Sequence, residues 1–181
     1  LINHNLLTMN KIAKVDIHNH AITSCTKEYL ISKGIRLAAD KITDIESLIN
    51  FSRSNLSPLQ QIESGLRLLL VGNFENCINT GVKIVGTSID YKVCMRTFNG
   101  DVSKFINFLK TFKYDELEIL WDLHISRDSY KIEHKPLIIE LINTKYFGGF
   151  DLASTENIVP NSEFKEFYQL ANSLVMITKV H

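Results

Sequence analysis

The chain lacks several features that would assign it to a special class of protein. Its three cysteines form no CxxC pair and are odd in number, which argues against a disulfide framework and suits a reducing compartment. Twenty basic residues balance twenty acidic ones, so no charge excess indicates nucleic acid or an anionic membrane as a partner. No apolar run reaches the roughly 18 residues of a membrane-spanning helix, and the N-terminus has no leader pattern. We therefore expect a cytoplasmic globular protein with no membrane and no nucleic-acid partner.

The residues that are present alternate between strand-like and helix-like patterns, without repeats or linkers. With 45% hydrophobic and 22% charged residues, the composition is that of an ordinary globular domain. Strands are predicted at residues 11–18, 82–90, 117–125, 146–152 and 174–181. Helices are predicted at residues 26–33, from 43 onward, and at 57–80, 101–112, 129–144 and 161–173. This alternation predicts parallel strands with right-handed crossovers, either in a doubly wound sheet or in part of a (β/α)8 barrel.

Local signals set the expected limits of two helices. Thr43 and Glu46 have the spacing of a capping box. Ser57 suits the N-cap of the long third helix, with Pro58 at its first position, and Gly81 suits its end. Gly72 is a possible interruption of this helix.

The stretch "KVDIHNHAIT" carries the clearest chemical signal in the chain. Alternate residues of a strand share a face, so Asp16, His18 and His20 point one way at the end of the first strand. Two imidazoles in such positions can bind one zinc ion. His181 ends the fifth strand and therefore lies at the same edge of a parallel sheet. A histidine pair can arise by chance and a single strand-end histidine is commonly structural, but three on one edge favour a metal site.

Three segments together resemble the adenosine deaminase family of the metal-dependent amidohydrolase superfamily. "KVDIHNHAIT" resembles the family's first-strand metal motif, and "FGGFDLASTENIVP" resembles its fourth-strand segment. "EFYQLANSLVMITKVH" resembles the helix and strand that lead into a further metal motif. The resemblance implies a (β/α)8 barrel, of which this chain supplies about five strands. Residues 1–10 would be a loose leading segment, and 11–181 the N-terminal part of a single barrel domain.

The resemblance also implies roles for particular residues. His18, His20 and His181 correspond to ligands of one Zn²⁺ ion per chain. Asp151 takes a place expected to be structural, and Glu156 takes that of the last glutamate in the fourth-strand pattern. The catalytic acid of the family would lie three residues beyond His181, followed later by further metal ligands. The 181 residues alone are therefore expected to be inactive.

Departures from the family pattern bear on the substrate. Ile22 stands where the family has a sugar-binding aspartate, and Ser154 stands where a glycine approaches the purine. His124 lies near the end of the third strand and is either a candidate for lining the same site or a partly buried structural histidine. The second strand, which reads "GTSIDY", has no Glu-x-Arg pattern.

The expected function is zinc-dependent hydrolytic deamination of a small amine-bearing ring, such as an aminopurine. The sequence leaves two alternatives open. One is a metal-dependent phosphoesterase of the polymerase-and-histidinol-phosphatase type, which shares the Asp-x-His-x-His pattern. The other is a truncated, non-catalytic half-barrel.

Overall fold

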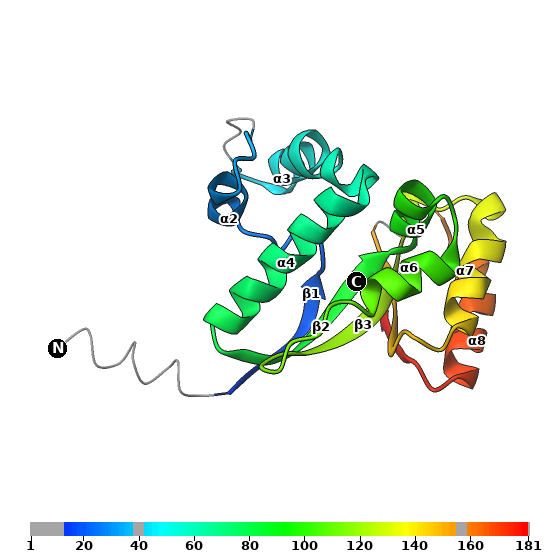
Figure 1. Cartoon of the computed structure of the whole chain (residues 1–181). Coiled ribbons are helices and arrows are strands. Elements are labelled where there is room, and N and C mark those ends of the chain that lie inside the picture. Colours follow the sequence, from blue (N-terminus) through cyan, green and yellow to red (C-terminus); the bar gives the residue numbers. More distant parts are fainter. Residues whose placement is uncertain (1–12, 38–41, 155–158, 181) are drawn as a thin grey trace. The chain divides into compact units, whose positions relative to one another are not determined.

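The computed structural model describes residues 13–37, 42–154 and 159–180 of the chain (Figure 1). The chain divides into two compact units. Unit 1 comprises Leu1–Val85 and Phe112–Ile119, and unit 2 comprises Gly86–Thr111 and Leu120–His181.

Five strands form one sheet in which the spatial order is the sequence order, β1-β2-β3-β4-β5. The strands are β1 (Lys14–His20), β2 (Val82–Asp90), β3 (Glu118–Ser126), β4 (Gly149–Ala153) and β5 (Ile177–Val180). β4 pairs in parallel with β3 and with β5, so that Asp151 lies beside His124 on one side and Lys179 on the other. Helical segments connect each strand to the next, as the alternating sequence pattern predicts. The predicted second strand matches β2 residue for residue.

The described residues of unit 1 form the α-helices α2 (Lys27–Ser32), α3 (Ile45–Phe51) and α4 (Glu63–Asn79), with a π-helical turn at Ser52–Leu56 and a 3-10 turn at Leu59–Gln61. Two expected caps are wrong. The capping box of α3 is formed by Asp44 and Ser47, whose side chains each bond the other residue's backbone N–H. Ser57 does not cap α4, because Ile62 is extended and separates α4 from the preceding turns.

Helix α4 runs through Gly72 without interruption, contrary to the interruption considered from the sequence. A Cβ on Gly72 would lie 2.4 Å from Tyr29 and 2.5 Å from the sulfur of Cys25. This glycine therefore lets the segment after β1 pack against the helix. The expected stop is confirmed: α4 ends at Asn79, and Gly81 follows with a positive φ of 81°.

Unit 2 contains α5 (Tyr91–Phe98), α6 (Val102–Leu109), α7 (Lys135–Asn143) and α8 (Lys165–Ser173), with 3-10 turns at Arg127–Ser129, Ile132–His134 and Asn161–Phe164. Helix α5 was not predicted. It starts directly after β2, with the Asp90 side chain accepting a bond from the N–H of Lys92, and ends at Asn99 in the left-handed region. α7 begins later than predicted, because a 3-10 turn precedes it and Pro136 occupies its first turn.

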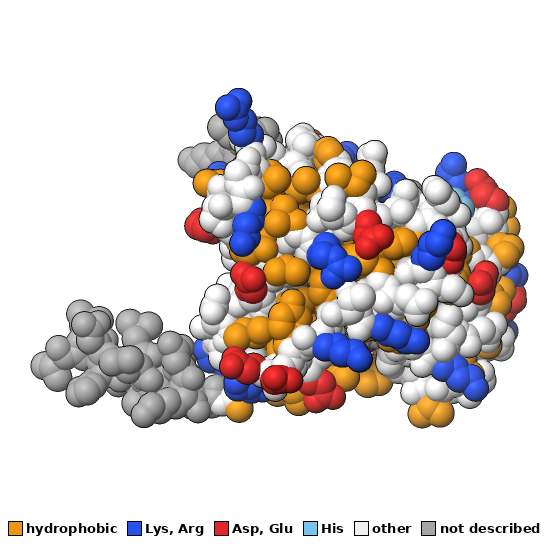
Figure 2. Space-filling model, viewed as in Figure 1, with side chains coloured by type: hydrophobic (Ala, Val, Ile, Leu, Met, Phe, Trp, Pro, Cys, Tyr) orange, Lys and Arg blue, Asp and Glu red, His pale blue; other side chains and the backbone are white. Residues whose placement is uncertain are grey.

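Each unit has its own apolar interior. In unit 1, Leu66, Leu70 and Phe74 of α4 are fully buried, and the Phe74 ring packs edge-on against Phe112 at 5.6 Å. In unit 2, the buried strand residues Leu123 and Phe150 share the interior with apolar residues of the surrounding helices. On the face shown in Figure 2, side chains of both charges are interspersed, in keeping with the balanced composition. Within the described residues, no helix has both the length and the apolar content needed to span a membrane.

Candidate metal and substrate site

The end of β1 presents two histidines on one face of the strand, as the sequence predicts. Val15 and Ile17 are 57% and 75% exposed, whereas Asp16, His18 and His20 are half-buried, so the two faces of the strand differ. The His18 and His20 rings lie with centroids 5.0 Å apart in an edge-to-face arrangement. Nε2 of His18 is shielded from solvent. This pair could supply two neutral imidazole ligands to a zinc ion.

Polar contacts fix the backbone around these histidines. The Asp16 carboxylate accepts from the backbone N–H of His18 and from the Asn19 side-chain amide, both at 3.2 Å. Asn73, fully buried on α4, donates to the Asn19 side-chain oxygen at 2.8 Å and to the Ala21 carbonyl at 3.3 Å. The bonds of Asp16 therefore fix the backbone at the end of β1, and Asn73 of α4 bonds to the turn that follows. Such contacts orient metal ligands in known sites.

The third expected ligand, His181, lies outside the described residues, as does Glu156. Among the residues that the structure does describe, no cluster of three or more His, Cys, Asp or Glu side chains could hold a metal ion. The set of His18, His20 and His181 therefore stays a prediction.

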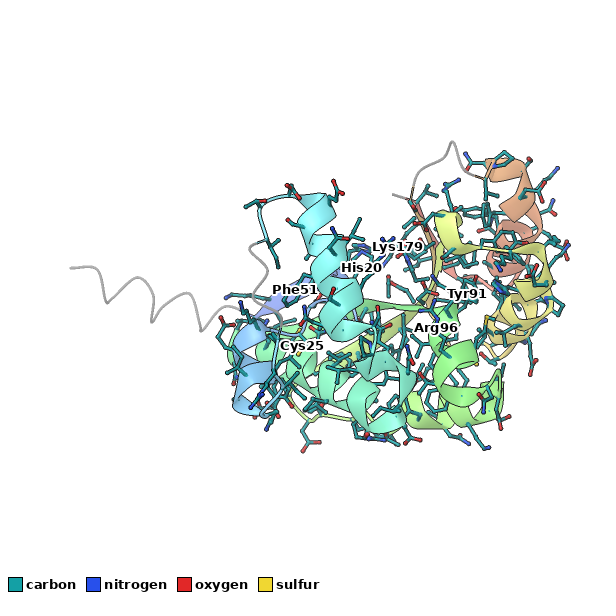
Figure 3. The ribbon with its side chains drawn as sticks, turned by 90° about the horizontal axis from the view of Figure 1, so that it is seen from above. His20, Cys25, Phe51, Tyr91, Arg96 and Lys179 are labelled. Carbon is teal, nitrogen blue, oxygen red and sulfur yellow. The ribbon has the colours of Figure 1, made fainter. Side chains whose placement is uncertain are left out.

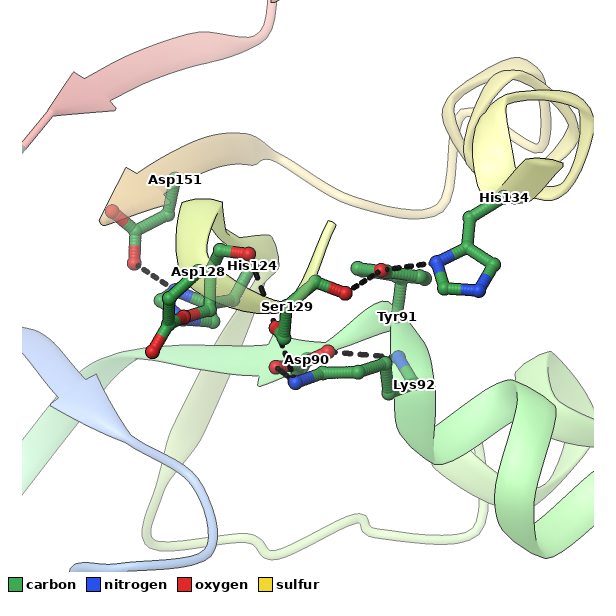
Figure 4. Close-up of polar contacts among 9 residues, drawn as sticks. Asp90, Tyr91, Lys92, His124, Asp128, Ser129, His134 and Asp151 are labelled. Atoms are coloured by element: carbon green, nitrogen blue, oxygen red, sulfur yellow. Dashed lines mark hydrogen bonds and ion pairs between the residues drawn. The ribbon is translucent and has the colours of Figure 1, made fainter. Parts of the chain in front are cut away.

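At the end of β3, His124 is buried and lies beside an acid. Its Nδ1 is 3.0 Å from Oδ2 of Asp151, which is completely buried on the neighbouring strand β4 (Figure 4). A carboxylate can only accept, so Nδ1 of His124 carries the proton of this bond. The sequence predicts a structural role for Asp151, and in the structure its carboxylate contacts the His124 ring. The proposed substrate-binding role of His124 stays a prediction.

An ion pair crosses β4 diagonally, from Lys179 in the register row of His124 and Asp151 to Asp122, two residues nearer the start of β3. Nζ of Lys179, on β5, lies 2.5 Å from Oδ2 of Asp122, on β3. Gly149 lies beside Asp122 in the sheet register, and a Cβ there would be 2.0 Å from Oδ1 of Asp122. The glycine therefore leaves room for the aspartate to reach across the strand.

The other expected site residues have distinct environments. Ile22 lies in the turn after β1 and is only 8% exposed. Ser154 follows β4 with a φ of 83°, in the left-handed region that favours glycine. Their roles towards a substrate stay predictions.

Cys25 lies in unit 1, close to the β1 turn (Figure 3). Burial and the nearby Glu75 raise the pKa of its thiol to about 11. It is therefore a protonated, packed side chain near neutral pH.

Sequence reasoning missed two groups of supporting residues. Asn73 lies more than fifty positions from its partners Asn19 and Ala21, so no local pattern indicates the contact. Asp122 and Lys179 occupy positions on β3 and β5 that only the register of the intervening β4 brings together. A polar residue in the middle of an apolar strand was the available signal for Asp122, because buried charges need partners.

No protein-family model matches the chain, and no curated protein matches it. Solved structures are similar to it in fold, and two of them show the range of this likeness. One is an amidohydrolase from Burkholderia ambifaria with bound zinc, at a TM-score of 0.70 and 12% identity, covering 100% of this chain and 55% of the other. The other is the apo N6-methyl-AMP deaminase from Arabidopsis thaliana, at a TM-score of 0.72 and 13% identity, covering 97% of this chain and 59% of the other.

These likenesses establish the architecture, because identities this low carry fold information alone. The chain spans less than two thirds of the length of either structure. Its five parallel strands and connecting helices form part of a (β/α)8 barrel, which confirms the barrel alternative over the doubly wound sheet.

Proposed function

We propose that these residues belong to a zinc-dependent hydrolase that removes an amine from a purine-like ring. The single observation that carries the proposal is the His18–His20 pair, with rings 5.0 Å apart at the end of β1, on a fold shared with a zinc-containing amidohydrolase. Ligand sites of (β/α)8 barrels lie at this end of the strands. A deaminase of the same fold supports the reaction class.

The residues present fit a zinc site in chemistry and support. His18 and His20 are expected to hold the ion, with His181 as the proposed third imidazole. Bound zinc supplies a water whose pKa is lowered towards about 7, as in other zinc hydrolases. Asp16, Asn19 and Asn73 keep the β1 turn in place, and the pair of His124 and Asp151 is proposed to line the substrate side in unit 2.

The chain spans 55% and 59% of the two solved structures, so the activity is proposed for the full-length gene product. The general acid that protonates the ring is expected beyond His181. The proposed location is cytoplasmic.

Unmodified adenosine is not the proposed preferred substrate. Ile22 cannot accept a hydrogen bond from a ribose hydroxyl, and burying that hydroxyl without a partner costs about 1–3 kcal/mol. The side chain of Ser154 adds bulk where the family pattern has none. Neither residue alters the imidazole ligands, so the hydrolytic step itself should be retained.

The test is amine release by the full-length, zinc-loaded protein from a panel of aminopurines, aminopyrimidines, their nucleosides and nucleotides. We expect release from at least one aminopurine compound, and its loss in a His18→Ala/His20→Ala variant that retains the native circular dichroism spectrum. Cleavage of a phosphate monoester with no amine release from any compound would refute the deaminase proposal. Adenosine as the best substrate by a wide margin would refute the roles given to Ile22 and Ser154.

A further inference from the structure

A pocket of about 330 Å³ lies in unit 2 between α5 and the segment that follows β3. Its lining comprises Lys92, Met95 and Arg96 from α5 with Ser129, Lys131 and His134 from the other side. Figure 3 labels Arg96 on the same helix as Tyr91, and Figure 4 shows the contacts of Lys92, Ser129 and His134. The volume is at the lower end of the range for small-molecule sites.

The lining contains three cations and no acid. Lys92 and Lys131 each have an acid nearby, Asp90 at 3.4 Å and Glu133 at 3.8 Å, but neither acid lines the pocket. Arg96 is exposed. An arginine in a polar concave site is suited to an anion with paired oxygens, because its guanidinium presents a fork of N–H donors.

Hydrogen bonds hold the two sides of the pocket together. Nζ of Lys92 donates to the Ser129 hydroxyl at 2.5 Å, and that hydroxyl donates to the Ser126 carbonyl at 3.1 Å. The Tyr91 hydroxyl lies 3.3 Å from the Ser129 carbonyl and 2.7 Å from Nδ1 of His134. The pocket is therefore preformed, which lowers the ordering cost of binding a ligand.

The Tyr91 contacts determine which ring nitrogen of His134 carries the proton. The Ser129 carbonyl can only accept, so it takes the single proton of the Tyr91 hydroxyl. The hydroxyl oxygen then accepts from Nδ1–H of His134, which leaves Nε2 of the neutral ring as a hydrogen-bond acceptor. Burial raises the pKa of Tyr91, so its hydroxyl stays neutral and does not repel an anion.

Backbone amides near the pocket are already used. The N–H of His134 bonds to the Lys131 carbonyl, and that of Lys135 bonds to the Ile132 carbonyl. Recognition of a ligand at the start of α7 must therefore come from side chains. The site therefore differs from anion sites in which free backbone N–H groups at a helix N-terminus bind the anion.

We propose that this pocket binds a phosphate group, as free orthophosphate or as the monoester of a mononucleotide. Phosphate has the charge and the paired oxygens that Arg96, Lys131 and Lys92 can satisfy together. The pocket adjoins the carboxyl ends of β2 and β3, which end at Asp90 and Ser126, and ligands of parallel barrels bind at such ends. One consequence rests on the proposed function: a deaminase with this pocket prefers a nucleoside monophosphate to the nucleoside.

The test is a titration of the isotope-labelled 181-residue chain with orthophosphate, AMP and adenosine, followed by NMR in 0.15 M chloride. Chloride at this level screens weak surface attraction. We expect orthophosphate and AMP to shift amide signals of α5 and residues 129–134, and adenosine to leave them unchanged. Arg96→Gln should weaken phosphate binding about tenfold or more, which corresponds to about 1.4 kcal/mol.

Lys165→Gln is the matched control, because it removes one exposed positive charge from unit 2 outside the pocket. It should bind phosphate like the unaltered chain. Absence of phosphate binding at millimolar concentration, or equal weakening by both variants, would overturn the proposal. Binding of orthophosphate without AMP would support the phosphate pocket, identify free phosphate as its ligand and overturn the nucleotide consequence. The readout needs neither metal nor turnover, so failure of the deaminase proposal would leave it intact.

Discussion

The histidines at the ends of β1 and β3 occupy equivalent places in sequence pattern but different environments. His18 and His20 are half-buried and adjoin each other, and the bonds that fix their segment are made by Asp16, Asn19 and Asn73. His124 is buried, and its Nδ1 contacts the fully buried carboxylate of Asp151. At the end of β1, backbone groups and neighbouring side chains make the hydrogen bonds that fix the segment. At the end of β3 the imidazole of His124 itself makes the hydrogen bond, to Asp151. A strand-end histidine therefore has to be interpreted from its neighbours.

The largest expected difference is between the stability effects of His124→Ala and His20→Ala. Removing the His124 ring takes away a partner of a buried carboxylate, so we expect a loss of about 2–4 kcal/mol in the free energy of unfolding. His20→Ala should cost less than about 1 kcal/mol, because the side chain is half-buried and is proposed to act through metal. Urea unfolding of both variants without metal measures this. Equal losses would remove the distinction between the two sites.

Gly149→Ala tests the ion pair that lies next to His124. The new Cβ would stand 2.0 Å from Oδ1 of Asp122 and 3.3 Å from the Ile177 carbonyl. Displacing Asp122 from Lys179 should lower stability by about 2 kcal/mol, within the range for overpacking. Gly148→Ala is the control, because a Cβ there meets nothing within 4 Å. If the two variants unfold at the same urea concentration, the close approach at Gly149 does not contribute to stability.

Asn73→Ala tests the support of the β1 turn. It removes the bonds to Asn19 and Ala21, and we expect zinc affinity to fall about tenfold, as for other outer partners of metal ligands. Asn79→Ala, at the exposed end of the same helix, should leave the affinity unchanged. Isothermal titration with zinc compares them. Unchanged affinity in Asn73→Ala would show that α4 does not position the histidines.

Ser154→Gly should have the smallest effect, and it should stabilise the protein. The positive φ of 83° is unfavourable for serine, so glycine is expected to raise the free energy of unfolding by about 0.5–1 kcal/mol. Ser103→Gly, at an exposed position inside α6, should lower it by about 0.5–1 kcal/mol. Thermal unfolding of the two variants measures whether each substitution raises or lowers the stability. A loss of stability in Ser154→Gly would mean that the serine side chain makes a contact worth more than the strain.

The fold was predictable from sequence because hydrophobic alternation and local caps determine most elements. β2 matches its predicted range, and Gly81 ends α4 as expected. α5 was missed because it has no loop before it: Asp90 is the last residue of β2 and also the N-cap of the helix. The cap of α3 was misplaced by one residue, because Asp44 competes successfully with Thr43 for the N-cap position.

The candidate site was only partly predictable. The His18–His20 pair follows from two-residue alternation along one strand, which is a local property. The Asn73–Asn19, Asp122–Lys179 and His124–Asp151 contacts depend on strand register and helix packing, which join residues far apart in the sequence. The phosphate pocket depends on α5, so the missed helix also concealed the pocket.

Zinc binding by the His18–His20 pair is the central claim, and metal content measures it most directly. The 181-residue chain, dialysed against micromolar zinc and analysed by mass spectrometry for metal and protein, should retain about one zinc per chain, held by imidazoles in the usual way for zinc sites. The His18→Ala/His20→Ala variant should retain none, whereas His134→Ala, altered outside the pair, should retain zinc like the unaltered chain. No zinc in the unaltered chain, or equal zinc in the double variant, would contradict the account.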